Sequence, residues 1–185
     1  MTPDQHAEWL TTRVDAARAH IPPQFAGATL DGLNGPELQA WCEQQIDGDP
    51  RNLLLSGAVG TGKTHAAWAC WPHLIGLGWV GSWVVLSELE LLDAYLPGGD
   101  RGRADRALGA NLLMLDDLGT AALSDWSRSR LTALIDYRWQ HRKATIVTSN
   151  LAPAKLAAHL GERATSRLAA DATSVRMLGA DRRTT

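Results

Sequence analysis

Cysteine is nearly absent from this sequence, and so is any long hydrophobic run. Cys42 and Cys70 are the two cysteines, and they lie far apart and outside any Cys-x-x-Cys pattern. The sequence therefore supports neither a disulfide framework nor a zinc ribbon, and we expect two buried, unreactive thiols. No apolar run approaches the roughly 18 residues that a membrane-spanning helix needs. The first ten residues contain Asp4 and Glu8 where a secretory signal would be basic and then apolar. We therefore expect a cytoplasmic protein with no membrane association.

Charge is distributed unevenly along the chain, although the net charge is only -2. Residues 1–100 hold 4 Lys and Arg against 12 Asp and Glu, whereas residues 101–185 hold 14 against 8. A basic half can attract phosphate backbones, and an acidic half that faces a neighbour's basic half favours head-to-tail self-assembly. The alternative, that the two halves mix in space and leave no charged face, stays open.

The hydrophobic pattern predicts alternating helices and strands in one domain of ordinary size, because 185 residues with 45% hydrophobic side chains suit a single core. Strands are predicted at Asn52–Ser56, Trp83–Leu86, Leu112–Leu115, Ala144–Thr148 and Ser174–Leu178. Helices are predicted from Thr2 to Pro22, at Pro36–Ile46, Lys63–Gly76, Ser87–Leu96, Asp100–Leu108 and Ser124–His141, and within Pro153–Ala170. This alternation predicts a parallel α/β sheet with helices on both faces.

One segment matches the phosphate-binding pattern G-x-x-x-x-G-K-[ST] and lies between a predicted strand and a predicted helix, as that motif requires. Its glycines let the backbone curl so that successive N–H groups point inward, and the helix N-terminus adds partial positive charge. We expect Lys63 to reach the β- and γ-phosphates of ATP, and Thr64 to hold Mg²⁺ through its hydroxyl. The nucleotide-binding residues are then Gly57, Ala58, Val59, Gly60, Thr61, Gly62, Lys63 and Thr64.

Two other predicted strands end in polar residues. The apolar run Asn111–Leu115 delivers Asp116 and Asp117 to the carboxyl edge of the sheet, where α/β sheets place their ligands. Asp116 is expected to hold Mg²⁺, mostly through water, and Asp117 to polarise the attacking water. The run Ala144–Thr148 is followed by a Ser-Asn pair in which Asn150 is placed to orient the same water. A Ser-Asn pair after a strand is also typical of an ordinary turn or helix cap, which is the alternative for Asn150.

Several segments together resemble the DnaC and IstB group of AAA+ ATPases. In chain order they are LMLDDLG (Leu113–Gly119), Tyr137-Arg138, TIVTSNL (Thr145–Leu151), GERATSRL (Gly161–Leu168) and Asp181-Arg182. The resemblance extends from about Ile21 to the end of the chain. It implies an α/β P-loop NTPase of the AAA+ type, with a parallel five-stranded sheet in the order 5-1-4-3-2, an extra helix at Ser87–Leu96, and a truncated or absent C-terminal lid. Residues 1–22 are then an N-terminal helix that either binds a partner or packs on the core, and residues 23–185 form the ATPase domain.

The resemblance also implies roles for three arginines. Arg167 matches the arginine finger that reaches the γ-phosphate held by a neighbouring subunit, Arg163 is a less certain helper, and Arg182 matches the sensor 2 arginine. A solvated surface charge is the alternative for each. Family members meet single-stranded DNA beside the extra helix, where this chain has Arg101, Arg103 and Arg106, with further positive charge at Arg128, Arg130, Arg138, Arg142 and Lys143. Phe25 and Leu30 precede the core as in the family and are expected to contact adenine, although any apolar linker would give the same pattern.

The function that this resemblance implies is ATP-dependent loading of a hexameric DnaB-type replicative helicase onto single-stranded DNA, with Mg-ATP hydrolysed at subunit interfaces. An IstB-like transposition helper is the main alternative. A small-molecule kinase and a non-hydrolysing ATP-gated adaptor are the alternatives from other classes. A kinase would turn over ATP as a monomer, and an adaptor would bind ATP without stimulated hydrolysis.

Overall fold

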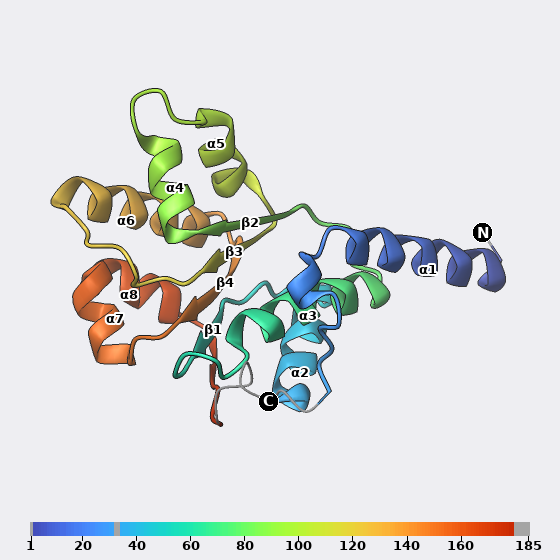
Figure 1. Ribbon diagram of the computed structural model, residues 1–185. Coiled ribbons are helices and arrows are strands. Elements are labelled where there is room, and N and C mark those ends of the chain that lie inside the picture. The colour runs from blue at the N-terminus through green and yellow to red at the C-terminus, as the bar shows by residue number, and fades with distance from the viewer. Residues whose placement is uncertain (1, 32–33, 180–185) are drawn as a thin grey trace. The chain divides into compact units, whose positions relative to one another are not determined.

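A computed structural model of the chain describes residues 2–31 and 34–179 (Figure 1). Contacts divide the chain into two compact units. The first comprises Met1–Asp49 and Thr64–Val80, and the second comprises Pro50–Lys63 and Gly81–Thr185. In the part of the chain that the structure describes, no helix is long and apolar enough to cross a membrane.

The first unit is helical. It contains α1 (Pro3–Ala19), the 3-10 turn η1 (Pro23–Phe25), α2 (Gly35–Ile46) and nearly all of α3 (Lys63–Gly76). Thr2 caps α1 and forms a capping box with Gln5, as Ser and Thr do at helix starts. The thiols of Cys42 in α2 and Cys70 in α3 are both fully buried, as predicted. Their mutual hydrogen bond and their burial raise the pKa of the Cys42 thiol far above its ordinary value.

The second unit is built on a parallel sheet whose strand order is β2-β3-β4-β1-β5, which confirms the predicted order. The strands are β1 (Leu53–Ser56), β2 (Trp83–Ser87), β3 (Leu112–Asp116), β4 (Ala144–Ser149) and β5 (Thr173–Arg176). The helices are α4 (Glu88–Tyr95), α5 (Arg101–Gly109), α6 (Asp125–Gln140), α7 (Pro153–Leu160) and α8 (Glu162–Ala169). Because all strands run parallel, their carboxyl ends meet at one edge.

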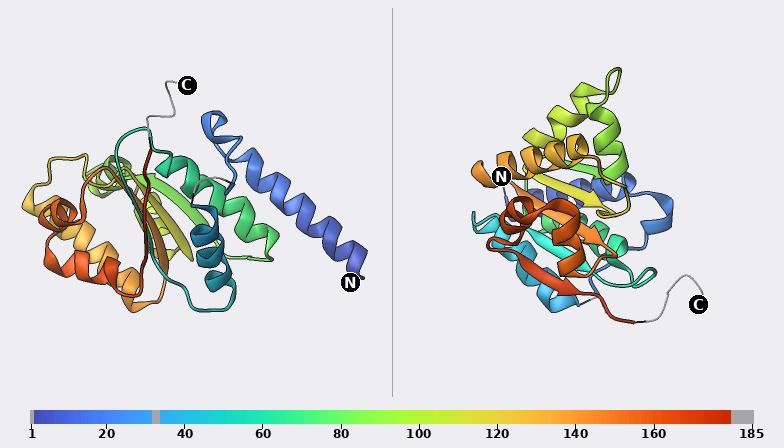
Figure 2. Two further views of the ribbon diagram at one scale, coloured as in Figure 1. Left: turned by 90° about the horizontal axis from the view of Figure 1, so that it is seen from below. Right: turned by 90° about the vertical axis from the view of Figure 1, so that its left-hand side faces the viewer.

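One apolar cluster fixes the helices of this unit on the sheet. Leu113 and Leu115 of β3 are fully buried in the cluster, together with Leu131 and Leu134 of α6 and Leu160 of α7. Figures 1 and 2 show α6, α7 and α8 together on one side of the sheet. β3 and β4 are central strands with almost no exposed residue, as expected of parallel strands covered on both faces. This burial gives the loops at the carboxyl edge a rigid support.

Arg138 is buried, which corrects its expected place among the exposed positive charges. Its side chain is 1% exposed, and burial lowers the pKa of its guanidinium to about 9, so the group is charged at neutral pH. The guanidinium donates to the carbonyls of Ala107 and Ala110 at the end of α5, to the carbonyl of Ala144 and to the hydroxyl of Thr145. Arg138 therefore joins α5 and α6 to β4 and is not available to DNA.

Candidate nucleotide-binding site

The loop between β1 and α3 is tightly curled, and its backbone lies close to the backbone of Met177. Gly57, Gly60 and Gly62 all have positive φ angles, which favour glycine. A Cβ atom on Gly57 would lie 2.3 Å from the carbonyl oxygen of Met177, so no side chain fits there. The hydroxyl of Thr61 donates to the carbonyl of Ala58 at 2.9 Å and fixes the turn from inside. The loop thus has the tight curl that the phosphate-binding pattern requires.

Lys63 ends this loop and opens α3. Its side chain is 5% exposed, and Nζ donates to the carbonyls of Gly57 and Ala58 at 3.1 and 2.7 Å. The N-terminus of a helix carries partial positive charge, and a lysine there adds a full charge that attracts anions. Phosphate oxygens are stronger acceptors than neutral carbonyls, so a nucleotide can take over these hydrogen bonds. Thr64 follows in the first turn of α3, at the helix start where the motif places its hydroxyl.

The ends of β3 and β4 bring the Asp116 carboxylate, the Asp117 backbone and the Thr148 hydroxyl together. β4 lies between β1 and β3, and Thr148 of β4 pairs with Leu55 of β1. The Thr148 hydroxyl is fully buried and donates to Oδ1 of Asp116 at 2.6 Å. The same hydroxyl oxygen accepts a hydrogen bond from the amide of Asp117 at 2.9 Å. Thr148 therefore holds Asp116 by its carboxylate and Asp117 by its backbone.

The residues present fit Mg-ATP. The glycine loop offers a curled backbone, Lys63 offers a buried ammonium, and Asp116 offers a carboxylate at the same sheet edge. Hydroxyl and carboxylate oxygens are the ligands that Mg²⁺ prefers, and they hold it together with phosphate oxygens. Asp117 is exposed and has a φ of 54°, a backbone conformation that Asp adopts more readily than most residues.

Known proteins share this chain's sequence pattern and fold. The profile of the family described as IstB-like ATP binding protein matches residues 39–176. The chain belongs to this family. An ATP-binding protein of insertion sequence IS1162 from Pseudomonas fluorescens is 32% identical over 149 residues, which are 75% of this chain and 64% of that protein. The replicative helicase loader DnaC of Buchnera aphidicola is 29% identical over 122 residues, 63% of this chain and 50% of that protein.

Solved structures agree on the fold. The crystal structure of the DnaC helicase loader superposes with a TM-score of 0.73 at 24% identity, over 85% of this chain and 100% of that one. The fold of this IstB-like protein is therefore the AAA+ P-loop fold, as predicted. The chain spans about half to two thirds of the length of the two curated relatives described above.

The remaining predicted site residues of this IstB-like protein do not all lie at the carboxyl edge of the sheet. Asn150 lies one residue beyond β4, at the carboxyl edge, and is exposed. Arg167 lies on α8, where its guanidinium carbon is 3.6 Å from the ring centroid of Trp139 and its Nε is 3.7 Å from Oδ1 of Asp136. Arg182 lies outside the described residues. Phe25 is half-buried and stacks on Trp68 at a centroid distance of 6.4 Å, and Leu30 is buried.

Two polar residues of this site were not predicted from the sequence. Thr148 ends the predicted strand there, and a hydroxyl directly after apolar strand residues is a signal for such a contact. Glu88 directly follows β2, as Asp116 and Asp117 follow the apolar part of β3, and its side chain is completely buried. The shared signal is a polar residue at a strand's carboxyl end, which sequence alone does not separate from a helix cap.

Replacing Thr148 with valine is expected to slow ATP hydrolysis. Valine keeps the shape but leaves the Asp116 carboxylate and the Asp117 amide without their shared hydroxyl. Loss of a group that orients a metal ligand typically lowers activity about 10- to 100-fold. Steady-state ATPase rates of Thr148→Val and Thr148→Ser variants measure the effect. The serine variant keeps a hydroxyl and is expected to stay within about 3-fold of the unmodified protein, so equal losses in both variants would contradict the role.

Proposed function

We propose that this chain hydrolyses Mg-ATP and, as an assembly, loads a hexameric replicative helicase onto single-stranded DNA. One observation carries the ATPase part of the proposal. The Thr148 hydroxyl joins Asp116 to the backbone of Asp117 at the sheet edge where the glycine loop begins. A phosphate-binding loop alone would serve many nucleotide-binding proteins, whereas an oriented Asp116 carboxylate beside it, followed by Asp117 with a fixed backbone, suits hydrolysis.

Each residue of the site has a distinct task in this proposal. The loop amides and Lys63 bind the β- and γ-phosphates, while Thr64 and Asp116 hold Mg²⁺. The metal ion, when bound, neutralises the negative charge that builds up on the phosphate oxygens. Asp117 polarises the attacking water, and Asn150 orients it from the neighbouring strand end.

Arg167 acts on a neighbouring subunit in this proposal, and its position supports that assignment. The side-chain amide of Asn52, which precedes β1, donates to the carbonyls of Arg167 and Leu168 at 3.5 and 3.0 Å. Arg167 therefore lies beside the amino end of β1, whereas the glycine loop leaves its carboxyl end. Four strand residues span about 13 Å, which puts the chain's own phosphate site beyond an arginine side chain. Arg182 remains proposed as the sensor 2 arginine.

Single-stranded DNA is proposed to bind along α5. Arg101 and Arg106 are exposed on this helix and Arg103 is half-exposed. Arg103 lies 3.7 Å from Glu90, and Arg106 lies 3.5 Å from Asp100. Exposed ion pairs of this length are weak, so the guanidinium groups can exchange these carboxylates for phosphates. Binding of this kind is insensitive to sequence and weakens as salt rises.

The helicase contact is proposed for residues 1–22. α1 is exposed along most of its length, and only Ala17 is buried within it. Trp9 is 38% exposed, stacks with His6 and lies under the guanidinium of Arg13. Tryptophan and arginine are enriched among the residues that contribute most to binding at protein interfaces. Residues 23–185 then form the ATPase domain.

A second function has support of its own. The relative that is 32% identical is an insertion-sequence protein, and the matching family carries the IstB-like description. An ATP-dependent transposition helper would use the same nucleotide site and the same head-to-tail assembly. The two functions differ in the protein that is bound.

ATPase rate measured against protein concentration, with and without single-stranded oligo(dT), tests the proposal. The rate per subunit is expected to rise with concentration because neighbouring subunits complete each site, and to rise further with DNA. Pull-down with a DnaB-type helicase or with a transposase then separates the two partners. A flat rate per subunit that DNA does not change would contradict an assembly that acts on DNA.

A further inference from the structure

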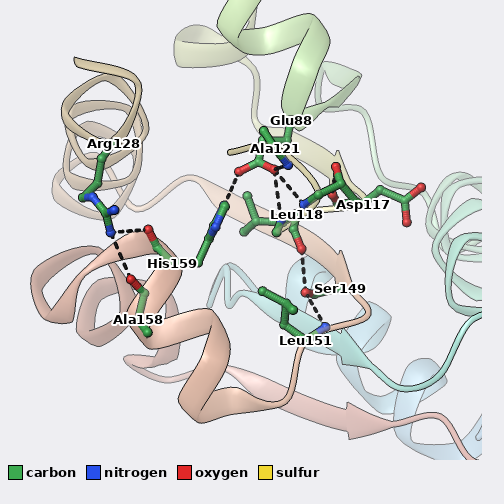
Figure 3. A network of polar contacts seen from close by, with 11 residues as sticks. Glu88, Asp117, Leu118, Ala121, Arg128, Ser149, Leu151, Ala158 and His159 are labelled. Atoms are coloured by element: carbon green, nitrogen blue, oxygen red, sulfur yellow. Dashed lines mark hydrogen bonds and ion pairs between the residues drawn. The ribbon is translucent and has the colours of Figure 1, made fainter. Parts of the chain in front are cut away.

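A buried glutamate joins the loop after Asp117 to two helices. Glu88 opens α4 and its side chain is 0% exposed. Its Oε1 lies 2.6 Å from Nε2 of His159, near the end of α7. Its Oε2 accepts hydrogen bonds at 3.1, 3.0 and 2.9 Å from three consecutive backbone amides, those of Gly119, Thr120 and Ala121. Figure 3 shows this carboxylate between the loop and the His159 ring. Four hydrogen bonds to one buried carboxylate form a strong anchor.

The loop is held from its other side by β4. The amide of Leu118 donates to the carbonyl of Thr148 at 2.9 Å, and the Ser149 hydroxyl donates to the carbonyl of Leu118 at 2.6 Å. Gly119 has a φ of 101°, and a Cβ there would lie 2.4 Å from Leu151. The loop is therefore held between β4 and Glu88, and the Leu151 side chain leaves no room for a side chain at position 119.

The fixed loop determines the backbone of Asp117. Asp117 has a left-handed conformation, which persists only where neighbouring groups hold it. Thr148 holds its amide, and the hydroxyl of Thr120 donates to its carbonyl at 3.0 Å. The amide of Thr120 is in turn bound by Glu88. A continuous chain of hydrogen bonds thus runs from the Glu88 carboxylate to the residue proposed to polarise water.

Glu88 is not needed to cap its own helix. Ser87 is the N-cap of α4 and forms a capping box with Glu90, so the helix start is already satisfied. The pairing of β2 with β3 places Ser87 opposite Asp116, and the Glu88 carboxylate then reaches the loop that follows Asp117. The carboxylate is directed to the loop and not to its own helix.

We propose that Glu88 is a positioning residue for ATP hydrolysis, which holds Asp117 in its active geometry through Thr120 and the loop amides. The proposal rests on the proposed ATPase function of the site. His159 orients the carboxylate, and Arg128 of α6 fixes His159 in turn by donating to its carbonyl at 2.6 Å. Glu88 touches neither nucleotide nor metal in this role, so it affects the rate of hydrolysis and not the binding of ATP.

Kinetics of Glu88 variants test this role. Glu88→Ala is expected to lower kcat about 10- to 100-fold, because small displacements of a catalytic group have effects of this size. The Kd for ATP, measured by calorimetry, is expected to stay within about 3-fold. Glu88→Gln keeps an acceptor oxygen for the loop amides, so this variant is expected to retain most of the kcat of the unmodified protein. Asp93→Ala is the matched control, because it removes an exposed carboxylate from the same helix and leaves the cap of α4 intact.

A double-mutant cycle with Asp117→Ala separates positioning from general support of the fold. If Glu88 acts through Asp117, Glu88→Ala lowers kcat no further in the Asp117→Ala background. Equal losses in both backgrounds would overturn the proposal. If the Glu88→Ala protein shows no unfolding transition and is therefore not folded, the Glu88→Asp variant takes its place. It keeps the negative charge but withdraws the carboxylate from the loop by one methylene. Full kcat in Glu88→Asp would overturn the proposal. If the unmodified protein does not hydrolyse ATP, both the proposed function and this inference are contradicted. If the unmodified protein and all Glu88 variants hydrolyse ATP at the same rate, only the inference is contradicted.

Discussion

Lys63→Ala protein is expected to lose ATP turnover and most of its affinity for ATP. The Lys63 ammonium is the buried cation of the glycine loop and lies within hydrogen-bonding distance of the Gly57 and Ala58 carbonyls. Charge-assisted hydrogen bonds contribute about 1.5–3 kcal/mol each, which corresponds to roughly a 10- to 100-fold rise in Kd for one such bond. Turnover falls further, because the same charge stabilises the phosphate oxygens during hydrolysis.

Calorimetric titration with ATP and steady-state turnover measure the two effects of Lys63→Ala. Lys155 offers a matched control, because it is an exposed lysine on α7 and its removal is expected to change neither quantity. ATP should raise the Tm of the unmodified protein and of the Lys155→Ala variant, since a ligand that binds only the folded state stabilises it. Unchanged ATP affinity and turnover in Lys63→Ala would remove the phosphate-binding assignment.

Arg167→Ala is expected to bind ATP normally and to hydrolyse it about 10³- to 10⁵-fold more slowly, the effect typical of an arginine that stabilises the transferring phosphate. The residue lies beside the amino end of β1, away from the chain's own loop, which fits the proposal that it acts on a neighbouring subunit. Its guanidinium must first leave the Trp139 ring and the Asp136 carboxylate. The arginine is thus presented at the surface but is restrained in the isolated chain.

Mixing Arg167→Ala protein with Lys63→Ala protein tests action between subunits. In an equal mixture that assembles head to tail, about a quarter of the interfaces pair an intact loop with an intact arginine. Activity should therefore recover toward that fraction, although neither variant is active alone. Absence of any recovery, with assembly confirmed by sedimentation, would contradict a shared site. Arg18→Ala provides a control for the loss of an arginine, because Arg18 is exposed on α1, where it lies 4.0 Å from Asp15.

Local patterns predicted most of the elements. α3 begins at Lys63 and ends at Gly76 as expected, and Ser87 and Ser124 cap α4 and α6 at the predicted positions. Caps and apolar periods act over a few residues, so sequence reveals them directly. The strand order 5-1-4-3-2 came from the family resemblance, because strand pairing depends on contacts between distant segments. The turn η1 was not predicted, since Pro23 was interpreted only as the end of a helix.

The sequence predicted least well which of the charged side chains are exposed. Arg138 occurs between other basic residues in the sequence, yet it is buried because the carbonyls at the end of α5 and the start of β4 surround it. Arg128 is likewise engaged, with its guanidinium on the carbonyls of Ala158 and His159. A count of charges therefore overstates the surface that is free to meet DNA.

The sequence by itself determined the glycine loop, the apolar strand that delivers Asp116 and Asp117, and the alternation that makes a parallel sheet. Each depends on neighbouring residues only. The tertiary structure alone decided that Thr148 holds both aspartates and that Glu88 fixes the loop behind them. These contacts join residues that are 31 to 33 positions apart, and only the strand register and the packing of α4 bring them within hydrogen-bonding distance.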